Sequence, residues 1–454
     1  MLPATEVRPV SRGALRSAAG AIIFGSFFII LAARLFRLTS RYSVNIFFWD
    51  QWGFNNATLF QKHSLWQMFR WQYGPHRLGL GPLVSELIEP YFHWNSRAES
   101  FVACSVVVLA AGFALWLKKR LFGEISIWDA AIPIVYLSAT QYESLFITSD
   151  LAHGPLPLLL VTLYCLAWTL PEIFVRYVLV LALNFVTINT GFGLFLGFLT
   201  PLLLAVDYWV NLRTKPRAQL YFAAALLIAC ASLASFFYGY TVQPAVSCFS
   251  LKFQTPLQYL WYVSLMFANF FEVKGVGPFP ILIGCLVILW LLCTLVAAVR
   301  NMLNSATQSW IQNAVSATLV GYSFLFSVST AIGRLCLGLE YAQSSRYTNY
   351  LALGIFGAYL HLFSIHPSKL RRVLLAVAIV ALLATVPIRA EDRGLMRSFS
   401  EIKRSWRSCY LAGGSILECD SAAGYKIGPE PEQVLREKLH YLKRTRNNLY
   451  SDSN

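Results

Sequence analysis

The chain has 454 residues, of which 57% are hydrophobic and only 13% are charged. A soluble domain carries roughly 25% charged residues, and here the deficit is spread along the whole chain. The composition therefore excludes an ordinary soluble protein with a single membrane anchor. The formal net charge of +15 is explained by cytoplasmic loops and attraction to anionic lipid headgroups, so a lipid bilayer is the expected partner. Since no RNA- or DNA-binding module is present, no nucleic acid is expected.

Apolar runs long enough to cross a ~30 Å hydrocarbon core recur along the chain. In lipid the backbone must satisfy its own hydrogen bonds, so these runs are expected to be helices. The first run follows a signal-peptide-like basic segment. However, it continues into Arg34 and Arg37 without a convincing cleavage site, which indicates an uncleaved span. The prediction is an all-α integral membrane protein with about eleven spans: residues 18–38, 101–117, 130–146, 156–170, 173–188, 191–210, 220–238, 281–299, 314–332, 350–365 and 373–388.

Basic residues in short loops predict the orientation, because cytoplasmic loops are rich in Lys and Arg. With the N-terminus in the cytoplasm, that side receives Arg8, Arg12, Arg16, Lys118, Lys119, Arg120, Arg213, Lys215, Arg217, Arg300, Lys369, Arg371 and Arg372. Three segments then lie outside: a long first loop (39–100), residues 241–280 and a small C-terminal tail (389–454). The polytopic domain is expected to be 1–388. Within its first loop, residues 57–69 and 78–92 are expected to be helices lying along the membrane surface.

Four groups of polar residues fall on the external side in this topology. They are Phe48-Trp49-Asp50-Gln51-Trp52, Gly74-Pro75-His76-Arg77, the pair Glu143 and Asp150, and Gly333-Arg334 with Glu340 and Ser345-Arg346-Tyr347. Their gathering on one face predicts a site at the external water boundary.

This arrangement resembles the GT-C superfamily of integral membrane glycosyltransferases, which use sugars linked to polyprenyl phosphate. The resemblance lies in an acidic residue soon after the first span, in a long external loop with surface helices. In a bacterial branch, a D-x-W element such as Asp50-Gln51-Trp52 precedes an H-R element such as His76-Arg77. This chain departs from metal-dependent relatives, because no D-x-D or E-x-D pair stands near Asp150. The resemblance implies sugar transfer to a cell-surface glycan or lipid acceptor at a bacterial plasma membrane.

Glycosyl transfer with inversion needs a base for the acceptor hydroxyl, and Asp50 is the candidate. The alternative is that Asp50 caps the following helix. A leaving lipid phosphate needs fixed cations. The candidates for binding it are His76, Arg77, Arg334 and Arg346, which are otherwise interfacial residues touching headgroups.

The other residues of these groups have less specific roles. Asp150 holds a divalent metal, positions the acceptor or caps a helix, and His153 is a weak metal partner for it. Glu143, near the membrane boundary, is expected to pair with one of the arginines. Trp52 and Tyr347 are further site candidates, and Glu340 is expected to be a solvated or salt-bridged loop residue.

Cys409 and Cys419 form either a disulfide or two unpaired thiols, while the other seven cysteines are expected to be small core residues. Two functions compete with the glycosyltransferase: a polysaccharide polymerase or ligase of another membrane fold, and a transporter or flippase. The spans hold few charges, which disfavours a transport pathway.

Overall fold

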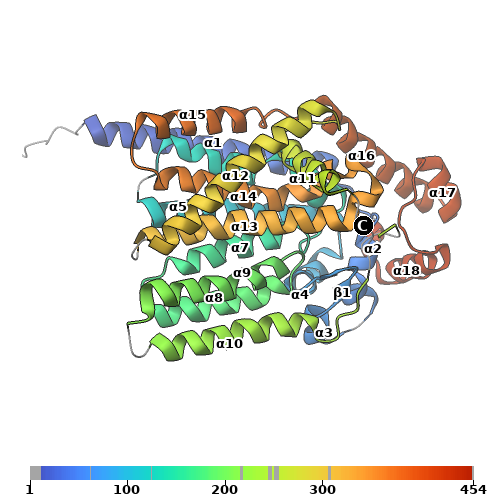
Figure 1. Cartoon of the computed structure of the whole chain (residues 1–454). Helices are drawn as coiled ribbons and strands as arrows, with labels where there is room; N and C mark the ends of the chain where they lie inside the picture. Colours follow the sequence, from blue (N-terminus) through green and yellow to red (C-terminus); the bar gives the residue numbers. More distant parts are fainter. Residues whose placement is uncertain are drawn as a thin grey trace, which may run out of the picture.

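The computed structural model describes residues 12–61, 63–123, 125–214, 218–243, 248–249, 255–304 and 308–451. Within these residues the regular structure is almost entirely helical, and the long helices run side by side in one bundle (Figure 1). The bundle helices are α1 (Arg12–Tyr42), α5 (Ser96–Phe122), α7 (Pro155–Trp168), α8 (Ile173–Ile188), α9 (Leu194–Asp207), α10 (Ala218–Phe237), α12 (Pro278–Asn304), α13 (Gln308–Arg334), α14 (Thr348–Ser364) and α15 (Lys369–Leu383). The remaining elements are α2 (Gln51–Phe54), α3 (Leu65–Phe69), β1 (Gln72–Tyr73), β2 (His76–Arg77), α4 (Leu80–Ile88), α6 (Ala131–Tyr136), α11 (Pro256–Phe270), α16 (Ala390–Leu411), α17 (Ile416–Ala423) and α18 (Glu432–Thr445).

Six helices within the described residues are long and apolar enough to cross a membrane, so the chain is a multi-pass membrane protein. Their apolar stretches are Ile22–Tyr42, Ser96–Phe122, Leu194–Leu212, Ala218–Phe237, Pro278–Asn304 and Ser309–Leu337. They correspond to the first, second, sixth, seventh, eighth and ninth expected spans. The fourth, fifth, tenth and eleventh are helices as predicted, but they have only 14, 16, 17 and 15 residues. Six spans, rather than eleven, therefore meet the criteria of length and composition.

The third expected span, residues 130–146, is not one continuous helix. Helix α6 ends at Tyr136 and is followed by a 3-10 turn and a short π-helix, η5 (Glu143–Ile147). The Gln141 side chain donates to the carbonyl of Tyr136 (2.6 Å), and the Ser138 hydroxyl accepts from the backbone N–H of Thr140 (3.2 Å). Such side-chain bonds compete with the helical backbone pattern and explain the break.

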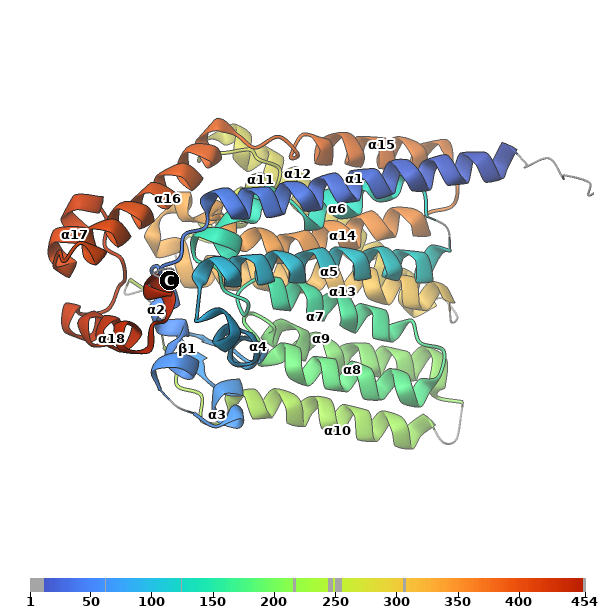
Figure 2. The same cartoon turned by 180° about the vertical axis from the view of Figure 1, so that it is seen from behind.

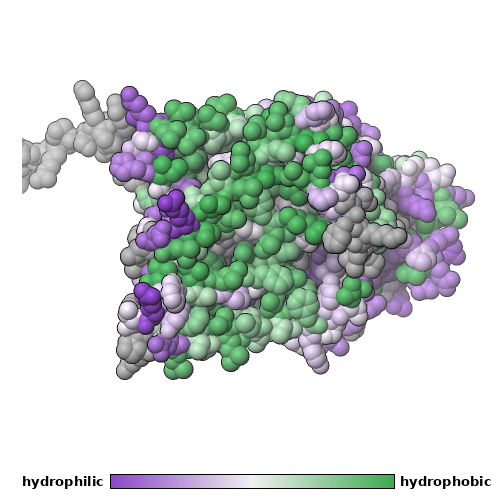
Figure 3. Space-filling model, in the orientation of Figure 1, coloured by the Kyte–Doolittle hydropathy of each residue, from purple (hydrophilic) through white to green (hydrophobic). Residues whose placement is uncertain are grey.

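Apolar side chains cover the middle of the bundle, and polar residues gather at its two ends (Figure 3). Leu202 on α9 is 64% exposed, and Leu286 and Val296 on α12 are 54% and 66% exposed. An apolar surface this continuous is incompatible with water contact in a soluble monomer. It forms the belt that faces the hydrocarbon core of the bilayer.

Basic connections lie at the end of the bundle that also holds the start of α1 (Figure 1). The turn from α12 to α13 follows Arg300, and the turn from α14 to α15 precedes Arg371 and Arg372. Of the basic residues used to predict orientation, Arg8, Lys215 and Arg217 lie outside the described residues. These basic connections therefore share one end of the bundle, and the side of the membrane that this end faces remains a prediction.

Residues 241–280, expected as an external loop, contain the helix α11, which packs into the bundle. The Ser264 hydroxyl lies 3.3 Å from the sulfur of Cys285 on α12. A Cβ atom added at Gly284 would lie 1.9 Å from the carbonyl oxygen of Ser264, so the two helices touch backbone to backbone. The helix is too short to meet the length of a span, and its residues Tyr262–Phe270 are buried by neighbouring helices.

The two apolar stretches of the first loop form short helices, as predicted. On α3, Leu65 and Trp66 are 66% and 55% exposed; Leu87 on α4 is 70% exposed, and Tyr91 in the 3-10 turn after it is 81% exposed. Apolar and aromatic side chains left open in this way are typical of helices at a membrane interface. Their position on the membrane surface remains a prediction.

The tail packs against the first loop at the end of the bundle opposite the N-terminus (Figures 1 and 2). The buried Lys403 amine donates to the carbonyls of Phe146 (3.2 Å) and Ile147 (2.9 Å). The Lys438 amine donates to the carbonyl of Trp52 (2.9 Å). The tail, through Lys438, therefore supports the loop that carries Asp50.

Of the two alternatives for Cys409 and Cys419, the disulfide is the one present, with a Cα–Cα distance of 5.5 Å. A second disulfide joins Cys248 to Cys336. The expectation that these two cysteines are core residues is therefore wrong. They are 88 residues apart. Both lie outside the expected spans, in segments predicted to be external, whereas the other five cysteines lie within spans. That position was the available signal, but the sequence does not show which of them pair.

Candidate active site

The turn before Asp50 has an unusual backbone. Trp49 has a φ of 54°, in the left-handed region that side chains other than glycine rarely adopt. Its N–H donates to the carbonyl of Ile427 in the tail (2.8 Å), and the N–H of Phe48 donates to the side chain of Gln51 (3.1 Å). Strained residues held by their surroundings are common at functional sites. Here the tail and α2 together hold the turn that presents Asp50.

Asn448 of the tail fixes the start of the same loop. Its side chain is fully buried. It accepts from the N–H of Phe47 (3.0 Å) and donates to the Trp94 carbonyl (2.7 Å) and the Ser96 hydroxyl (3.0 Å). Three hydrogen bonds from one side chain thus tie both ends of the first loop to the tail.

Trp52, a site candidate from the sequence, is a packing residue. It is fully buried, and its ring lies 5.5 Å from that of Phe47 and 6.3 Å from that of Phe60. A Cβ atom at Gly428 would come within 2.7 Å of it. Trp52 therefore anchors α2 against the tail and does not face a cavity.

The Asp50 carboxylate points into a cavity. It precedes α2 but makes no capping hydrogen bond, so its side chain does not cap that helix. One carboxylate oxygen accepts from the Tyr73 hydroxyl (3.2 Å), and the other lies 3.5 Å from a guanidinium nitrogen of Arg346. Burial and the Asp50 charge raise the pKa of Tyr73, which keeps its hydroxyl a donor. Asp50 remains 25% exposed, so a bound molecule can reach it.

Arg346 joins Asp50 to Glu143, which confirms the predicted pairing of Glu143 with an arginine. The Arg346 Nε donates to Glu143 Oε1 (2.9 Å), and its Nη2 bonds to the same oxygen. The Ser344 hydroxyl donates to the other oxygen of Glu143 (2.9 Å). Burial opposes the charge on Arg346, but Glu143 and Asp50 raise its pKa above the usual value. This arginine is a permanent cation beside Asp50.

Two histidines and Asp150 also line the cavity. Asp150 accepts from the N–H of Ala152 (2.8 Å), as expected of a turn before α7, and its second oxygen pairs with Nδ1 of His153. The His153 ring lies 4.9 Å from that of His76. Burial, with the charges of His153 and Arg334, lowers the pKa of His76 well below its ordinary value. His76 is therefore a neutral hydrogen-bonding group near pH 7.

The described residues contain no group of three or more His, Cys, Asp or Glu side chains arranged to hold a metal ion. Asp150 and His153 form a pair without a third ligand in place. A divalent metal therefore stays an expectation from the sequence alone.

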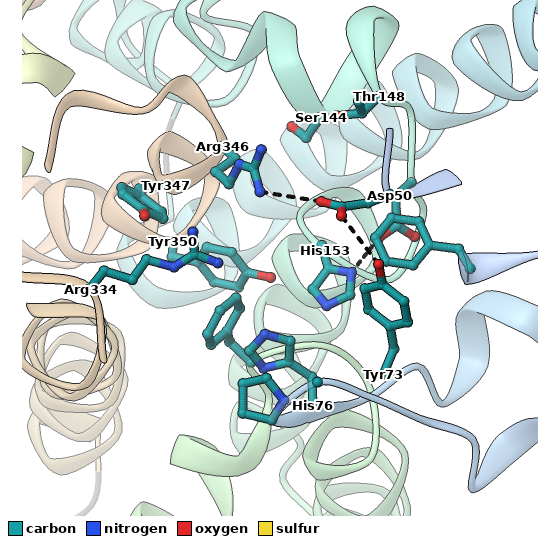
Figure 4. A pocket seen from close by; sticks show the side chains of 15 residues that line it. Asp50, Tyr73, His76, Ser144, Thr148, His153, Arg334, Arg346, Tyr347 and Tyr350 are labelled. Atoms are coloured by element: carbon teal, nitrogen blue, oxygen red, sulfur yellow. Dashed lines mark hydrogen bonds and ion pairs between the residues drawn. The ribbon is translucent and has the colours of Figure 1, made fainter. Parts of the chain in front are cut away.

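Arg334 approaches the cavity from the end of α13 (Figure 4). Its guanidinium lies 6.0 Å from the centre of the Tyr347 ring. Among the residues that the structure describes, no carboxylate lies within salt-bridge distance of Arg334. A cation without a counter-charge, half-buried at the wall of a cavity, is suited to binding an anion.

Arg77, by contrast, lies away from the cavity. Only 2% of it is exposed. Its guanidinium donates to the carbonyls of Phe236 (2.8 Å), Tyr238 (2.9 Å) and Arg70. Its predicted role in phosphate binding does not fit this arrangement, because its donors already hold α10 and the loop after it against the first loop.

The cavity has a volume of about 250 Å³ and brings together side chains from segments that are far apart in the chain (Figure 4). Its walls include Asp50, Tyr73, His76, Ser144, Thr148, Asp150, His153, Phe192, Arg334, Arg346, Tyr347 and Tyr350. A second cavity of about 280 Å³ adjoins it and shares His76, Phe192 and Arg334. We call the second one the apolar groove, because its further walls include Leu194, Phe195 and Phe236.

Tyr73, Thr148, Phe192 and Tyr350 line the cavity but were not predicted from the sequence. Tyr73 carries the clearest signal, since it stands directly before the Gly74-Pro75-His76 turn. The two-residue strands β1 and β2 pair Tyr73 with His76, which places both beside the cavity. Thr148 follows the short π-helix η5, Phe192 lies in the turn between α8 and α9, and Tyr350 lies on α14. Only the fold brings these three to the cavity.

Comparisons of the sequence with models of known protein families and with curated proteins found no match.

Proposed function

We propose that this protein is an inverting glycosyltransferase of the GT-C type, which moves a sugar from a polyprenyl-phosphate carrier to a cell-surface glycan or lipid acceptor. One observation carries the proposal. The carboxylate of Asp50 faces a cavity together with Arg334 and Arg346, and that cavity adjoins an apolar groove. A base, fixed cations and an apolar channel are the parts that this reaction needs.

In the proposed reaction Asp50 is the general base. It takes the proton of an acceptor hydroxyl as the hydroxyl oxygen attacks the anomeric carbon of the donor sugar. The bond from that carbon to the phosphate oxygen breaks, and polyprenyl phosphate leaves with the electron pair. A positioned base contributes roughly 10²- to 10⁴-fold to such a rate. Tyr73 and Arg346 orient the Asp50 carboxylate for this role.

The departing phosphate needs positive charge, and Arg334 is the candidate for supplying it. It lines both the cavity and the apolar groove, so a phosphate bound there has an apolar path beside it. Neutral His76, which also lines both, is available as a hydrogen-bond donor. We assign the first isoprene units of the carrier to the apolar groove, between Phe195 and Phe236.

The orientation of the protein is part of the proposal. Both disulfides lie in segments at the end of the bundle that holds Asp50, and disulfides persist on the oxidising side of a membrane. The basic connections lie at the other end, as cytoplasmic loops do. We therefore infer an N-terminus in the cytoplasm, a tail outside, and a bacterial plasma membrane as the location.

Asp50→Asn tests the proposal in a strain that lacks the native gene. The variant keeps an acceptor for the Tyr73 hydroxyl, so we expect normal amounts of folded protein in the membrane and a surface glycan lacking the transferred sugar. Purified Asp50→Asn should retain co-purified polyprenyl phosphate in native mass spectrometry, while Arg334→Met should lose it. Arg397→Met, an exposed arginine of the tail, is the matched control. An unchanged surface glycan in Asp50→Asn would refute the assignment of the base.

The same variants separate the alternatives. A polysaccharide polymerase or ligase of another membrane fold, and a transporter or flippase, do not require an acid directly after the first span. Full activity of Asp50→Asn, together with loss of function in Arg334→Met, would favour one of them.

A further inference from the structure

A third cavity opens at the other side of Arg346, between the first loop, the turn after α13 and the tail. It has a volume of about 370 Å³, which is within the range of about 300 to 1,000 Å³ typical of ligand pockets. We call it the tail groove. Thr148 and Arg346 line both it and the cavity of Asp50, so the two spaces meet at these residues.

Aromatic rings form one wall of the tail groove, and the tail supplies two of them. The ring of Tyr425 lies 5.7 Å from Phe48, 5.6 Å from Trp49 and 6.0 Å from Phe399. Tyr341, on the opposite side, is 52% exposed. Tyr425 and Trp49 are half-buried, so each retains a surface open to the groove. Rings fixed in this way offer an apolar face with polar edges.

A carboxylate faces the same space. Glu340 is exposed and, among the described residues, makes no salt bridge or hydrogen bond through its side chain. An ionised carboxylate accepts hydrogen bonds through both oxygens. Pyranose rings have an apolar face of C–H groups and an edge of hydroxyl donors. The aromatic faces of the tail groove and the carboxylate of Glu340 match that pattern. A lipid chain does not, because it has no hydrogen-bond donors for the carboxylate.

The backbone of Trp49 fixes one of the aromatic rings of the tail groove. The left-handed conformation of Trp49 turns its ring toward Tyr425, and the bond from its N–H to Ile427 secures that turn. Asp50 follows directly. Two adjacent residues therefore serve different cavities: Trp49 presents its ring to the tail groove, and Asp50 presents its carboxylate to the first cavity.

We propose that the tail groove binds a saccharide acceptor, with a sugar ring stacked on Tyr425 and Trp49 and its hydroxyls bonded to Glu340. This inference rests on the proposed function and narrows its acceptor from a glycan or lipid to a glycan. The acceptor hydroxyl enters the site past Thr148 and Arg346 and so meets Asp50 from the side opposite the apolar groove. The tail becomes part of the binding site as well as a support.

Binding is tested without turnover. Fluorescent nanodiscs that contain the full chain are applied to an array of oligosaccharides made of hexoses, pentoses and N-acetylhexosamines. We expect wild type to bind a subset of the array. Tyr425→Ala should weaken that binding at least tenfold, Glu340→Gln several-fold, and Tyr425→Phe little, because it keeps the ring. Leu417→Ala, which removes an exposed side chain elsewhere in the tail, should bind as wild type does.

The outcomes separate the inference from the function on which it rests. Asp50→Asn should still bind the array, since the sugar ring lies in the tail groove, which Asp50 does not line, and asparagine keeps an acceptor for the hydroxyl that reaches it. If wild type binds saccharides on the array but Asp50→Asn retains full activity in cells, the proposed glycosyltransferase function is refuted, while saccharide binding in the tail groove is supported. If wild type binds no saccharide, or Tyr425→Ala and Glu340→Gln bind unchanged, the inference is overturned. If wild type retains a bound lipid that only Tyr425→Ala loses, the inference is also overturned, and that result would indicate a lipid acceptor in the tail groove.

Discussion

Replacement of Asn448 by alanine tests whether the tail holds the loop of Asp50. The change removes three buried hydrogen bonds, to Phe47, Trp94 and Ser96, each worth about 1 kcal/mol net. Asn448 also has a φ of 52°, where alanine costs ~1 kcal/mol more. We therefore expect the tail to dock less tightly by about 4 kcal/mol. Since every 1.4 kcal/mol is tenfold, the undocked fraction should rise roughly 10²- to 10³-fold.

Hydrogen exchange measured by mass spectrometry on the protein in nanodiscs reads this change directly. Amides of residues 45–53 and of the tail should exchange faster by a similar factor, while amides of the spans stay protected. Asn447→Ala is the matched control, because its side chain makes no hydrogen bond within the described part of the chain. Equal exchange in the two variants would show that the tail is not what secures the loop.

Three further predictions concern other parts of the structure. Burial lowers the pKa of Lys403 to about 7, while the unfolded chain keeps that proton up to about pH 10. The free energy of unfolding therefore rises with pH between these two values. The melting temperature of wild type minus that of Lys403→Met should increase from about pH 6.5 to about pH 9.5. A difference that does not change with pH would contradict this prediction. At Gly191 (φ 57°), a Cβ would lie 2.1 Å from the carbonyl oxygen of Ala152. Gly191→Ala should therefore yield little folded protein by size-exclusion chromatography. Gly112→Ala, which has open space, should fold normally. Glu143→Gln leaves Arg346 with only Asp50 as a carboxylate partner, so we expect transfer to fall about tenfold with the melting temperature lowered; activity at the wild-type level would contradict a positioning role.

Several features follow from local sequence because their physical cause is local. Long apolar runs must become helices in lipid, and the basic loops separate the two ends of the bundle. The disulfide of Cys409 and Cys419 spans ten residues in a polar segment, so its possibility could be recognised. Asp50, His76, Asp150, Arg334, Arg346 and Tyr347 were all predicted site residues, and the fold brings them to one cavity.

Other predictions were wrong because contacts between residues far apart in the chain determine the role of the residue or segment. Arg77 has the sequence context of a phosphate ligand, but the carbonyls of Phe236 and Tyr238 bind its guanidinium. Residues 256–270 are too short to count as a span, yet burial by α12, α13 and α14 makes them part of the bundle. The local sequence around a residue does not determine which distant carbonyl group or helix will contact it in the folded protein.

The membrane class, the helical content and the gathering of ionisable residues at one end could all be derived from the sequence, because hydrophobicity and charge act on each segment separately. The tertiary structure decided that the tail supports Trp49 and Asp50, that Tyr73 and Arg346 orient the carboxylate, and that the number of long spans is six within the described residues. These depend on pairs of residues far apart in the chain, such as Trp49 with Ile427. Their contacts arise only when the packed helices bring the two partners together.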